Sequence, residues 1–284
     1  MTDPGSPQAA TEDYRDVNRA YWNERAPAHA ASPGYDVQQF HDDPAFLSGV
    51  VRFDLPRLGD VAGLTGVHLQ CHIGTDTISL ARLGAQMTGL DLSDASIGQA
   101  RDLADRAHVD VAFIEGELYR APDLLPHGSF DLVYTGIGAL CWLPDIRRWA
   151  GVVTTLLRPG GRLFIREAHP VLWALDDTRT DDLLVMGFPY FETSEPLAWD
   201  EDGSYVQVEG PFTATRSLAW NHGIGEIVTA LLDAGMRLTM LIEHQTVPWT
   251  ALPGRMVDTG SGEWALTGRR WRAPMSYTLQ AIKE

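Results

Sequence analysis

Residues 67–91 read VHLQCHIGTDTISLARLGAQMTGLD, and this stretch decides the fold. Its opening apolar run, residues 67–70, predicts a short strand that ends at a tight turn. Gly74 is the only glycine in that turn. A helix is predicted to follow, and Thr75 or Asp76 is placed to cap it by accepting hydrogen bonds from its free N–H groups.

A second strand follows this helix closely. Gly84 is placed to end the helix, and residues 85–90 then predict a buried strand with Asp91 at its carboxyl end. Strand, helix and strand in this order form a βαβ unit. A carboxylate at the tip of the second strand is the group that usually binds a ribose diol.

The turn of this unit suits some adenosine cofactors better than others. A dinucleotide needs the pattern G-x-G-x-x-G, because the backbone must approach the pyrophosphate closely. Gln70 and His72 stand where two such glycines would be, and their side chains argue against a pyrophosphate. S-adenosylmethionine has the adenosine and ribose but no phosphate, so it fits this turn better.

The composition narrows the choice of partners. Acidic residues outnumber basic ones by 38 to 22, which gives a formal net charge of −16. Nucleic acids and anionic membrane surfaces are therefore not expected as partners, although a net negative surface also serves solubility alone. Cys71 and Cys141 are too few for a disulfide framework and suit a reducing cytoplasm. We find neither a signal-peptide core nor an apolar run long enough to span a bilayer.

The first 60 residues predict a mobile tail at Met1–Thr11 and two helices, at residues 12–26 and 44–58, the second broken near Pro56. Together these helices are expected to form a cap over the cofactor crevice. Tyr21 and Trp22 lie on the apolar side of the first helix, where they would face the cofactor. The alternative is that both rings only pack on the core, as aromatic side chains mostly do.

The rest of the chain predicts alternating helices and strands, with one exception. Helices are expected at residues 95–107, 144–157 and 225–234, and strands at 109–115, 130–134, 162–166, 236–244 and 275–282. The exception is residues 171–223, which are rich in aromatic residues and predict only short strands at 205–208 and 213–218. This segment is interpreted as an insertion that covers the crevice and forms a substrate pocket, or else as the core of a small lobe.

Several motifs, in this order, resemble those of the class I S-adenosylmethionine-dependent methyltransferases. They are the turn at 68–74, Gly89-Leu90-Asp91, Gly116-Glu117, the strand FDLVY at 130–134 and Leu157-Arg158-Pro159-Gly160-Gly161. One such motif carries little information, but five in order over residues 61–283 are specific. The first motif, together with Trp142-Leu143-Pro144-Asp145 and Glu167-Ala168-His169-Pro170, looks like a branch of small bacterial methyltransferases.

This resemblance implies an α/β, Rossmann-like fold: a seven-stranded sheet with helices on both faces and the last strand antiparallel. The implied organisation is a tail and helical cap over residues 1–60, a cofactor-binding core over 61–170, an insertion or substrate lid over 171–223 after the fifth strand, and the end of the core over 224–284. A homodimer is compatible with this organisation.

The resemblance also implies S-adenosylmethionine as the cofactor and S-adenosylhomocysteine as the product. Asp91 would hold the ribose hydroxyls, Glu117 would accept from the adenine amino group, and Gly136 would form the wall near the methyl group. The residues expected to contact the cofactor are Tyr21, Trp22, Gln70, Cys71, His72, Gly74, Asp91, Leu92, Ser93, Glu117, Leu118 and Gly136. His68 departs from the family, which usually has an acidic residue there, and this bears on how the amino-acid end is held.

Catalytic and substrate residues are expected beyond the fifth strand. His169 follows that strand, at the edge where open α/β folds place their ligands, and a histidine can accept a proton near neutral pH. Glu167 would project to the same side and orient the imidazole or bind the acceptor. The alternatives are that His169 only bonds a neighbouring loop, or that no base is needed. The expected substrate residues are Trp142, Trp173, Tyr190 and Tyr205.

These observations predict an S-adenosylmethionine-dependent methyltransferase acting on oxygen, nitrogen or carbon of a small molecule, of the kind methylated in secondary metabolism. The alternatives are a non-catalytic module that binds an adenosyl cofactor, and an atypical nucleotide-dependent oxidoreductase. No set of histidine, cysteine and acidic residues has metal-ligand spacing, so no metal is predicted.

Overall fold

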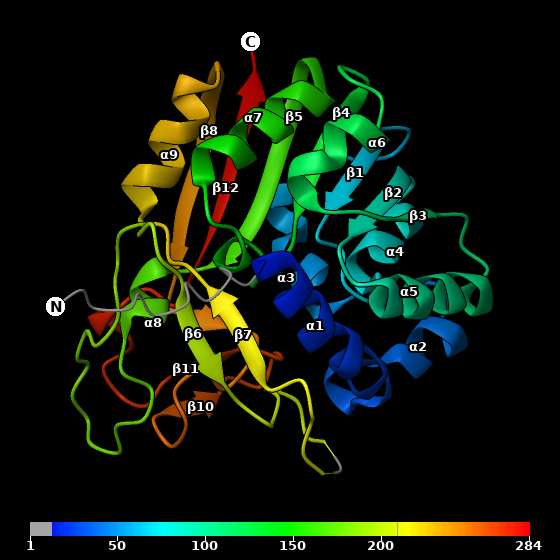
Figure 1. Cartoon of the computed structure of the whole chain (residues 1–284). Helices are drawn as coiled ribbons and strands as arrows, with labels where there is room; N and C mark the ends of the chain where they lie inside the picture. The colour runs from blue at the N-terminus through cyan, green and yellow to red at the C-terminus, as the bar shows by residue number, and fades with distance from the viewer. Residues whose placement is uncertain (1–12, 209) are drawn as a thin grey trace, which may run out of the picture.

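The computed structural model describes residues 13–208 and 210–284, so the tail predicted at Met1–Thr11 lies outside the described residues. A seven-stranded sheet in the order β3-β2-β1-β4-β5-β12-β8 forms the centre of the molecule (Figure 1). Its strands are β1 (Thr65–Leu69), β2 (Gln86–Asp91), β3 (Ala112–Glu115), β4 (Phe130–Thr135), β5 (Leu157–Ala168), β8 (Met236–His244) and β12 (Ser276–Lys283). The first five are parallel to one another, whereas β12 runs antiparallel to both β5 and β8. The predicted fold class is confirmed, antiparallel last strand included.

Helices cover both faces of this sheet, because the central parallel strands are apolar on both sides. One face carries α3 (Gly49–Leu58), α4 (Thr75–Arg82) and α5 (Asp94–Ala107); the other carries α6 (Ala121–Leu124), α7 (Ile146–Leu156) and α9 (Ile224–Asp233). Trp149 on α7 is wholly buried, in the apolar cluster between the sheet and helices α7 and α9. Helices thus cover both faces of the sheet, and ligands can bind only at the ends of its strands.

Several helix boundaries differ from the prediction, and the first helix continues to Ala31 instead of ending at residue 26. Neither Thr75 nor Asp76 caps α4, because the N-cap residue is Gly74 and no side chain accepts there. Helix α3 begins only after Ser48, whose hydroxyl accepts from the Val51 N–H, and it continues through Pro56 without a break. A proline near the end of a helix is tolerated when the residues behind it are held by packing, as Leu58 is here.

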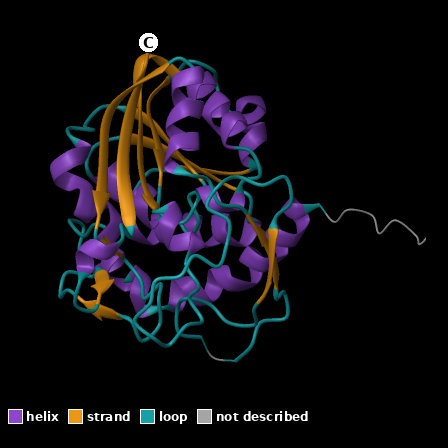
Figure 2. Cartoon of the chain, turned by 90° about the vertical axis from the view of Figure 1, so that its left-hand side faces the viewer, coloured by secondary structure: helices purple, strands orange, loops and turns teal. Residues whose placement is uncertain are grey.

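A second layer lies beyond the carboxyl ends of the parallel strands, opposite the C-terminus (Figures 1 and 2). It contains α1 (Tyr14–Ala31), α2 (Val37–Asp42), α8 (Pro170–Ala174), the ribbon of β6 (Leu197–Asp200) and β7 (Arg216–Ala219), and a small sheet of β9 (Thr246–Val247), β10 (Met256–Asp258) and β11 (Trp264–Leu266). Four single-turn helices, at Pro33–Tyr35, Leu118–Arg120, Leu140–Trp142 and Arg270–Arg272, complete the fold.

This layer was predicted only in part. The strand expected at 205–208 does not form, and β6 forms instead, earlier in the chain. The small sheet at 246–266 is a further insertion, between β8 and β12, that the sequence pattern did not indicate. Both insertions contribute to one apolar cluster, in which Leu172 packs with Val247 and Leu266.

Within residues 13–208 and 210–284, no helix is both long enough and apolar enough to cross a membrane.

Candidate cofactor and acceptor site

Asp91 ends β2 and joins it to the turn that follows β1. One carboxylate oxygen accepts from the backbone N–H of His72 at 2.8 Å, and the other accepts from that of Ser93 at 2.9 Å. Burial raises the pKa of Asp91 to about 6, although the backbone N–H groups act in the opposite direction. Each oxygen retains a free lone pair, so the carboxylate can still accept from a diol.

The turn between β1 and α4 adopts a backbone that favours glycine at two non-glycine positions. Gln70 has φ 59° and His72 has φ 49°, both in the left-handed region. Gly74 follows with φ 80°, and a Cβ there would lie 2.8 Å from atoms of Phe113 and Ala100. The backbone of the turn therefore has the conformation that glycines would adopt. The side chains of Gln70 and His72 occupy space that glycines would leave open. The side-chain amide of Gln70 donates to the carbonyl of Ala139 at 2.9 Å.

The residues expected at the adenine end lie one strand further along the same edge. The backbone N–H of Gly116 donates to the Asp91 carbonyl at 2.8 Å, which brings the loop after β3 against the tip of β2. Glu117 accepts from the hydroxyl of Tyr14 at 3.2 Å. Leu118 is buried behind it, and Leu92 is half-buried after β2. The predicted adenine residues are thus brought together.

Helix α1 crosses this edge, as a cap would. Asn23 accepts from the hydroxyl of Ser93 at 2.7 Å and donates to Asp94 at 2.6 Å, so α1 is tied to the start of α5. Trp22 projects over the turn, with its ring centroid 5.1 Å from that of His72. Tyr21 is buried instead. The packing alternative therefore fits Tyr21, and the cap fits Trp22.

Two histidines meet beneath this cap. His29 and His72 are joined through their ring nitrogens at 2.9 Å, and the second nitrogen of each contacts a serine, Ser204 and Ser96 respectively. Burial lowers the pKa of His29 to about 4 and that of His72 well below its usual value. Both rings are therefore neutral at pH 7, and they present no positive charge to a ligand.

A continuous row of aromatic rings leads from the turn into the insertions. Neighbouring centroids lie 5.2, 5.7, 4.8, 6.5 and 5.9 Å apart along the row Trp142, Trp22, His29, Tyr205, Trp249 and Trp173. We call this set the ring row. It brings together three of the four residues expected to contact substrate. The fourth, Tyr190, lies apart, because its hydroxyl accepts from Ile224 at the start of α9.

Glu167 is wholly engaged by the backbone. Its carboxylate accepts from four N–H groups at 2.5 to 2.8 Å, those of Gly138, Ala139, Leu140 and Ala168. Burial raises its pKa to about 7, against the lowering effect of these donors. The carboxylate anchors the loop after β4. The expectation that it orients His169 or binds the acceptor is not supported, since it has no bond to that imidazole.

His169 has partners at both ring nitrogens. Nδ1 accepts from the Val171 N–H at 3.1 Å and caps α8, and Nε2 donates to Glu243 at 2.8 Å. The imidazole is buried, and burial lowers its pKa. This corrects the expectation of a general base, because no lone pair remains free. The alternative reading, a histidine that holds a neighbouring segment, describes the contacts.

The sequence patterns did not indicate several residues that the structure places in the candidate site. His29, Tyr35 and Trp249 carry no periodic signal, because their contacts depend on segments far apart in the chain. Asn23 lies on the polar side of α1, whereas Arg25 lies four residues after Tyr21, on the apolar side. The structure buries Arg25 to 1% exposure. The spacing of Arg25, four residues after Tyr21 and three after Trp22, could have suggested that these side chains share a surface.

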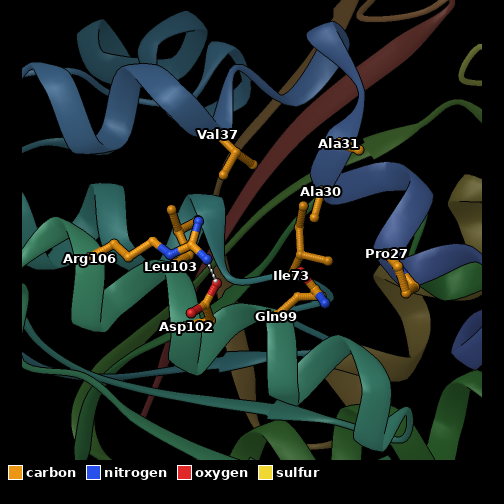
Figure 3. Close-up of a pocket in the computed structure, with 9 residues that line it drawn as sticks. All are labelled: Pro27, Ala30, Ala31, Val37, Ile73, Gln99, Asp102, Leu103 and Arg106. Atoms are coloured by element: carbon orange, nitrogen blue, oxygen red, sulfur yellow. Dashed lines mark ion pairs between the residues drawn. The ribbon is translucent and has the colours of Figure 1, made fainter.

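A separate cavity of about 230 Å³ lies between α1, α2 and α5 (Figure 3). It is lined by Pro27, Ala30, Ala31, Val37, Ile73, Gln99, Asp102, Leu103 and Arg106. Asp102 and Arg106 form an ion pair with each other at 2.9 Å, so neither charge is offered to a ligand. The cavity contains none of the side chains expected to bind the cofactor, and it is smaller than usual ligand pockets. We assign it no role.

Residues 13–208 and 210–284 contain no group of three or more histidine, cysteine or acidic side chains placed to hold a metal ion. Cys71 and Cys141 are both free thiols and both buried. Burial raises the pKa of each thiol well above its usual value, so neither is poised as a nucleophile.

Known proteins that this chain resembles include methyltransferases. A family model described as a methyltransferase domain matches residues 67–163. The chain is 33% identical over 147 residues to a ubiquinone biosynthesis O-methyltransferase of Methylococcus capsulatus, a match that covers 52% of this chain and 59% of that protein. The chain thus spans less than two thirds of the length of this curated relative.

Solved structures share the fold. An S-adenosylmethionine-dependent methyltransferase from Mesorhizobium loti has a TM-score of 0.55 at 20% identity, covering 86% of this chain and 100% of that one. A magnesium protoporphyrin IX methyltransferase from Synechocystis PCC 6803, solved with bound S-adenosylhomocysteine, has a TM-score of 0.57 at 18% identity, covering 96% and 100%.

Proposed function

Because this chain belongs to the class I S-adenosylmethionine-dependent methyltransferases, we propose that it binds S-adenosylmethionine along the carboxyl edge of its sheet and methylates a small molecule. The arrangement of Asp91 and Glu117 carries this proposal. The two carboxylates end or follow neighbouring strands, and α1 crosses above both. This arrangement suits a ribose bound at Asp91 and an adenine amino group bound at Glu117.

In this proposal the residues of this chain bind and orient the cofactor and the acceptor, and none of them donates or accepts a proton in the reaction. When bound, the cofactor would supply a sulfonium methyl group for in-line transfer to an acceptor nucleophile, with the thioether of S-adenosylhomocysteine as the leaving group. Gly136, which follows β4, would form the wall near the transferred methyl group. Trp22 and the ring row exclude water, which makes orientation and desolvation the main sources of rate.

The acceptor is proposed to be a small molecule with an apolar or aromatic body. The ring row supports this, because planar side chains stack favourably on planar ligands. The net charge of −16 disfavours polyanions. Oxygen, nitrogen or carbon could be the methylated atom, in a secondary-metabolic compound, and the buried free thiols are consistent with a cytoplasmic setting.

Labelling a bacterial lysate with methyl-tritiated cofactor and the purified chain tests this proposal. We expect radioactivity in the small-molecule fraction that depends on the added chain. The matched control is the Asp91→Ala chain, which should transfer little label. Label confined to protein or nucleic acid would contradict the proposed acceptor class, and no label anywhere would count against the activity.

His169→Gln should leave methyl transfer within a few-fold of the parent. The imidazole has no free lone pair to act as a base, and glutamine can still bond the neighbouring segment. Turnover is measured against pH, with thermal unfolding as the control for folding. Loss of turnover by two orders of magnitude in a folded variant would restore His169 as the base.

Cofactor affinity should fall as the pH drops through about 6. The pKa of Asp91 in the free protein is about 6, and the ribose hydroxyls donate best to its ionised form. Affinity is therefore full at about pH 7.5 and reduced at about pH 5.5, as calorimetry with S-adenosylhomocysteine can measure. The Asp91→Asn chain should show a smaller change over this range. An equal change in both chains would exclude Asp91 as its cause.

A further inference from the structure

Large apolar side chains are exposed on one surface of the second layer. Trp271 is 74% exposed, and Leu183 and Met186 are 58% and 55% exposed. Nη1 of Arg272 donates to the carbonyl of Asp182 at 2.6 Å, so the segment around Trp271 lies directly beside the segment that carries Leu183. Apolar side chains exposed together in this way are typical of a contact surface.

Arginines hold the second of these segments through its backbone. Arg255 is buried and donates to the carbonyls of Asp176 at 2.8 Å and of Leu183 at 3.1 Å, so both ends of the loop between them are fixed. Because backbone carbonyls accept these hydrogen bonds, the carboxylates of the loop stay available for other partners. We call residues 176–186 and 269–272 together the two-segment surface.

The segment 269–272 carries a positive charge that the chain does not neutralise. It reads Arg269-Arg270-Trp271-Arg272. Within residues 13–208 and 210–284, the exposed side chains of Arg269 and Arg270 form no ion pair, and Arg272 bonds a carbonyl. Such a basic segment stands out in a chain whose formal net charge is −16.

The neighbouring segment carries the opposite charge. Asp177 and Asp182 are exposed, and neither forms an ion pair with another described residue. Asp181 differs, because it pairs with Arg179. The two-segment surface therefore has two unpaired arginines in one segment and two unpaired aspartates in the segment beside it.

We propose that the two-segment surface binds the same surface of a second copy of this chain, across a two-fold axis that passes between the two segments. In such an interface each segment meets the other segment of the partner, so every contact is made twice. The basic segment of each copy then faces the acidic segment of its partner. Trp271 would be covered by the partner's Leu183 and the partner's Met186. The proposal does not depend on the proposed function.

Charge favours a second copy over a polyanion or an anionic membrane. Either of these would attract Arg269 and Arg270 but would be repelled by Asp177 and Asp182, whereas a second copy pairs all four. The net charge of −16 opposes association. At physiological ionic strength, however, charges more than about 8 Å apart are largely screened, and pairs in contact are screened less. Aromatic and arginine side chains are also enriched in protein interfaces.

Sedimentation equilibrium of the full chain at about 100 µM, in about 0.15 M salt, tests the proposal. We expect the parent to form dimers. Two charge-reversed chains, Arg269→Glu with Arg270→Glu and Asp177→Arg with Asp182→Arg, should each dimerise at least about tenfold more weakly, because like charges then meet. An equal mixture of the two chains should form a heterodimer, since both of its contacts again join opposite charges.

Arg120→Glu is the matched control, because it reverses an exposed charge outside the two-segment surface and should leave dimerisation unchanged. Thermal unfolding confirms that each chain is folded. A monomeric parent would overturn the proposal, and so would a dimer that persists in both charge-reversed chains, since another face would then form it. Failure of the mixture to dimerise would overturn the pairing of the two segments. Trp271→Ser should weaken the parent dimer without reversing any charge, and an unchanged dimer would contradict the predicted apolar contact.

Discussion

Replacing Asp91 by alanine should weaken S-adenosylmethionine binding at least tenfold. A ribose diol donates two hydrogen bonds to one carboxylate, and each bond to a charged group contributes about 1.5–3 kcal/mol. The carboxylate also positions the turn, because it accepts from the backbone N–H groups of His72 and Ser93. Calorimetric titration of the parent and the variant with S-adenosylhomocysteine measures the loss directly.

Two further chains separate binding from folding. Asp91→Asn keeps one acceptor oxygen for the turn, so it should remain folded and still lose most of the affinity. Glu115→Ala is the matched control, since Glu115 ends the neighbouring strand opposite Asp91 but is exposed. Unchanged affinity in a folded Asp91 variant would remove the ribose assignment, and equal losses in both positions would show a general charge effect.

Replacing Arg25 by alanine should free the β6–β7 ribbon from the rest of the molecule. The guanidinium donates to the carbonyls of Glu201 at 2.8 Å and Ala214 at 2.8 Å, and it lies over the Tyr21 ring at 3.4 Å. Hydrogen bonds from a buried charged group contribute about 1.5–3 kcal/mol each, so we expect the variant to lose about 3 kcal/mol of unfolding free energy. Denaturant unfolding measures this loss.

The ribbon and α1 should loosen together in this variant. Asn18 exchanges two hydrogen bonds of 2.9 Å with the backbone of Leu218, and Glu24 accepts from the backbone of Thr213, so Arg25 is one of three links between them. Limited proteolysis should therefore cut the ribbon of Arg25→Ala well before that of the parent. Arg15→Ala, whose partner Asp13 is exposed, is the control and should behave like the parent. Equal stability of both variants would show that the ribbon is held by other contacts.

The sequence predicted the central sheet well, because its signals are local. The run before Gly74, the strand FDLVY at 130–134 and the glycine-rich segment 157–161 each fix one element through period or turn chemistry. The order of these elements then leaves few ways to build a sheet. For this reason the tips of β2 and β3, and the candidate residues Asp91 and Glu117, could be located without coordinates.

The second layer was predicted poorly, because its contacts are long-range. The partners of Arg25 are backbone carbonyls of a segment almost 180 residues away, which no pattern within α1 can indicate. The strands at 246–266 are two or three residues long, too short to show a period. His169 shows the same limit: its position at the sheet edge was predictable, but not that Glu243 on β8 takes its second nitrogen.

The most direct test of the central claim is a calorimetric titration of the parent chain with S-adenosylhomocysteine and, separately, with the dinucleotide NAD⁺. The turn at 70–74 keeps the glycine-like backbone but carries the side chains of Gln70 and His72, and these argue against the close approach of a pyrophosphate. We therefore predict saturable binding of S-adenosylhomocysteine, and no heat from NAD⁺ beyond dilution. Binding of NAD⁺ without binding of S-adenosylhomocysteine would contradict the account.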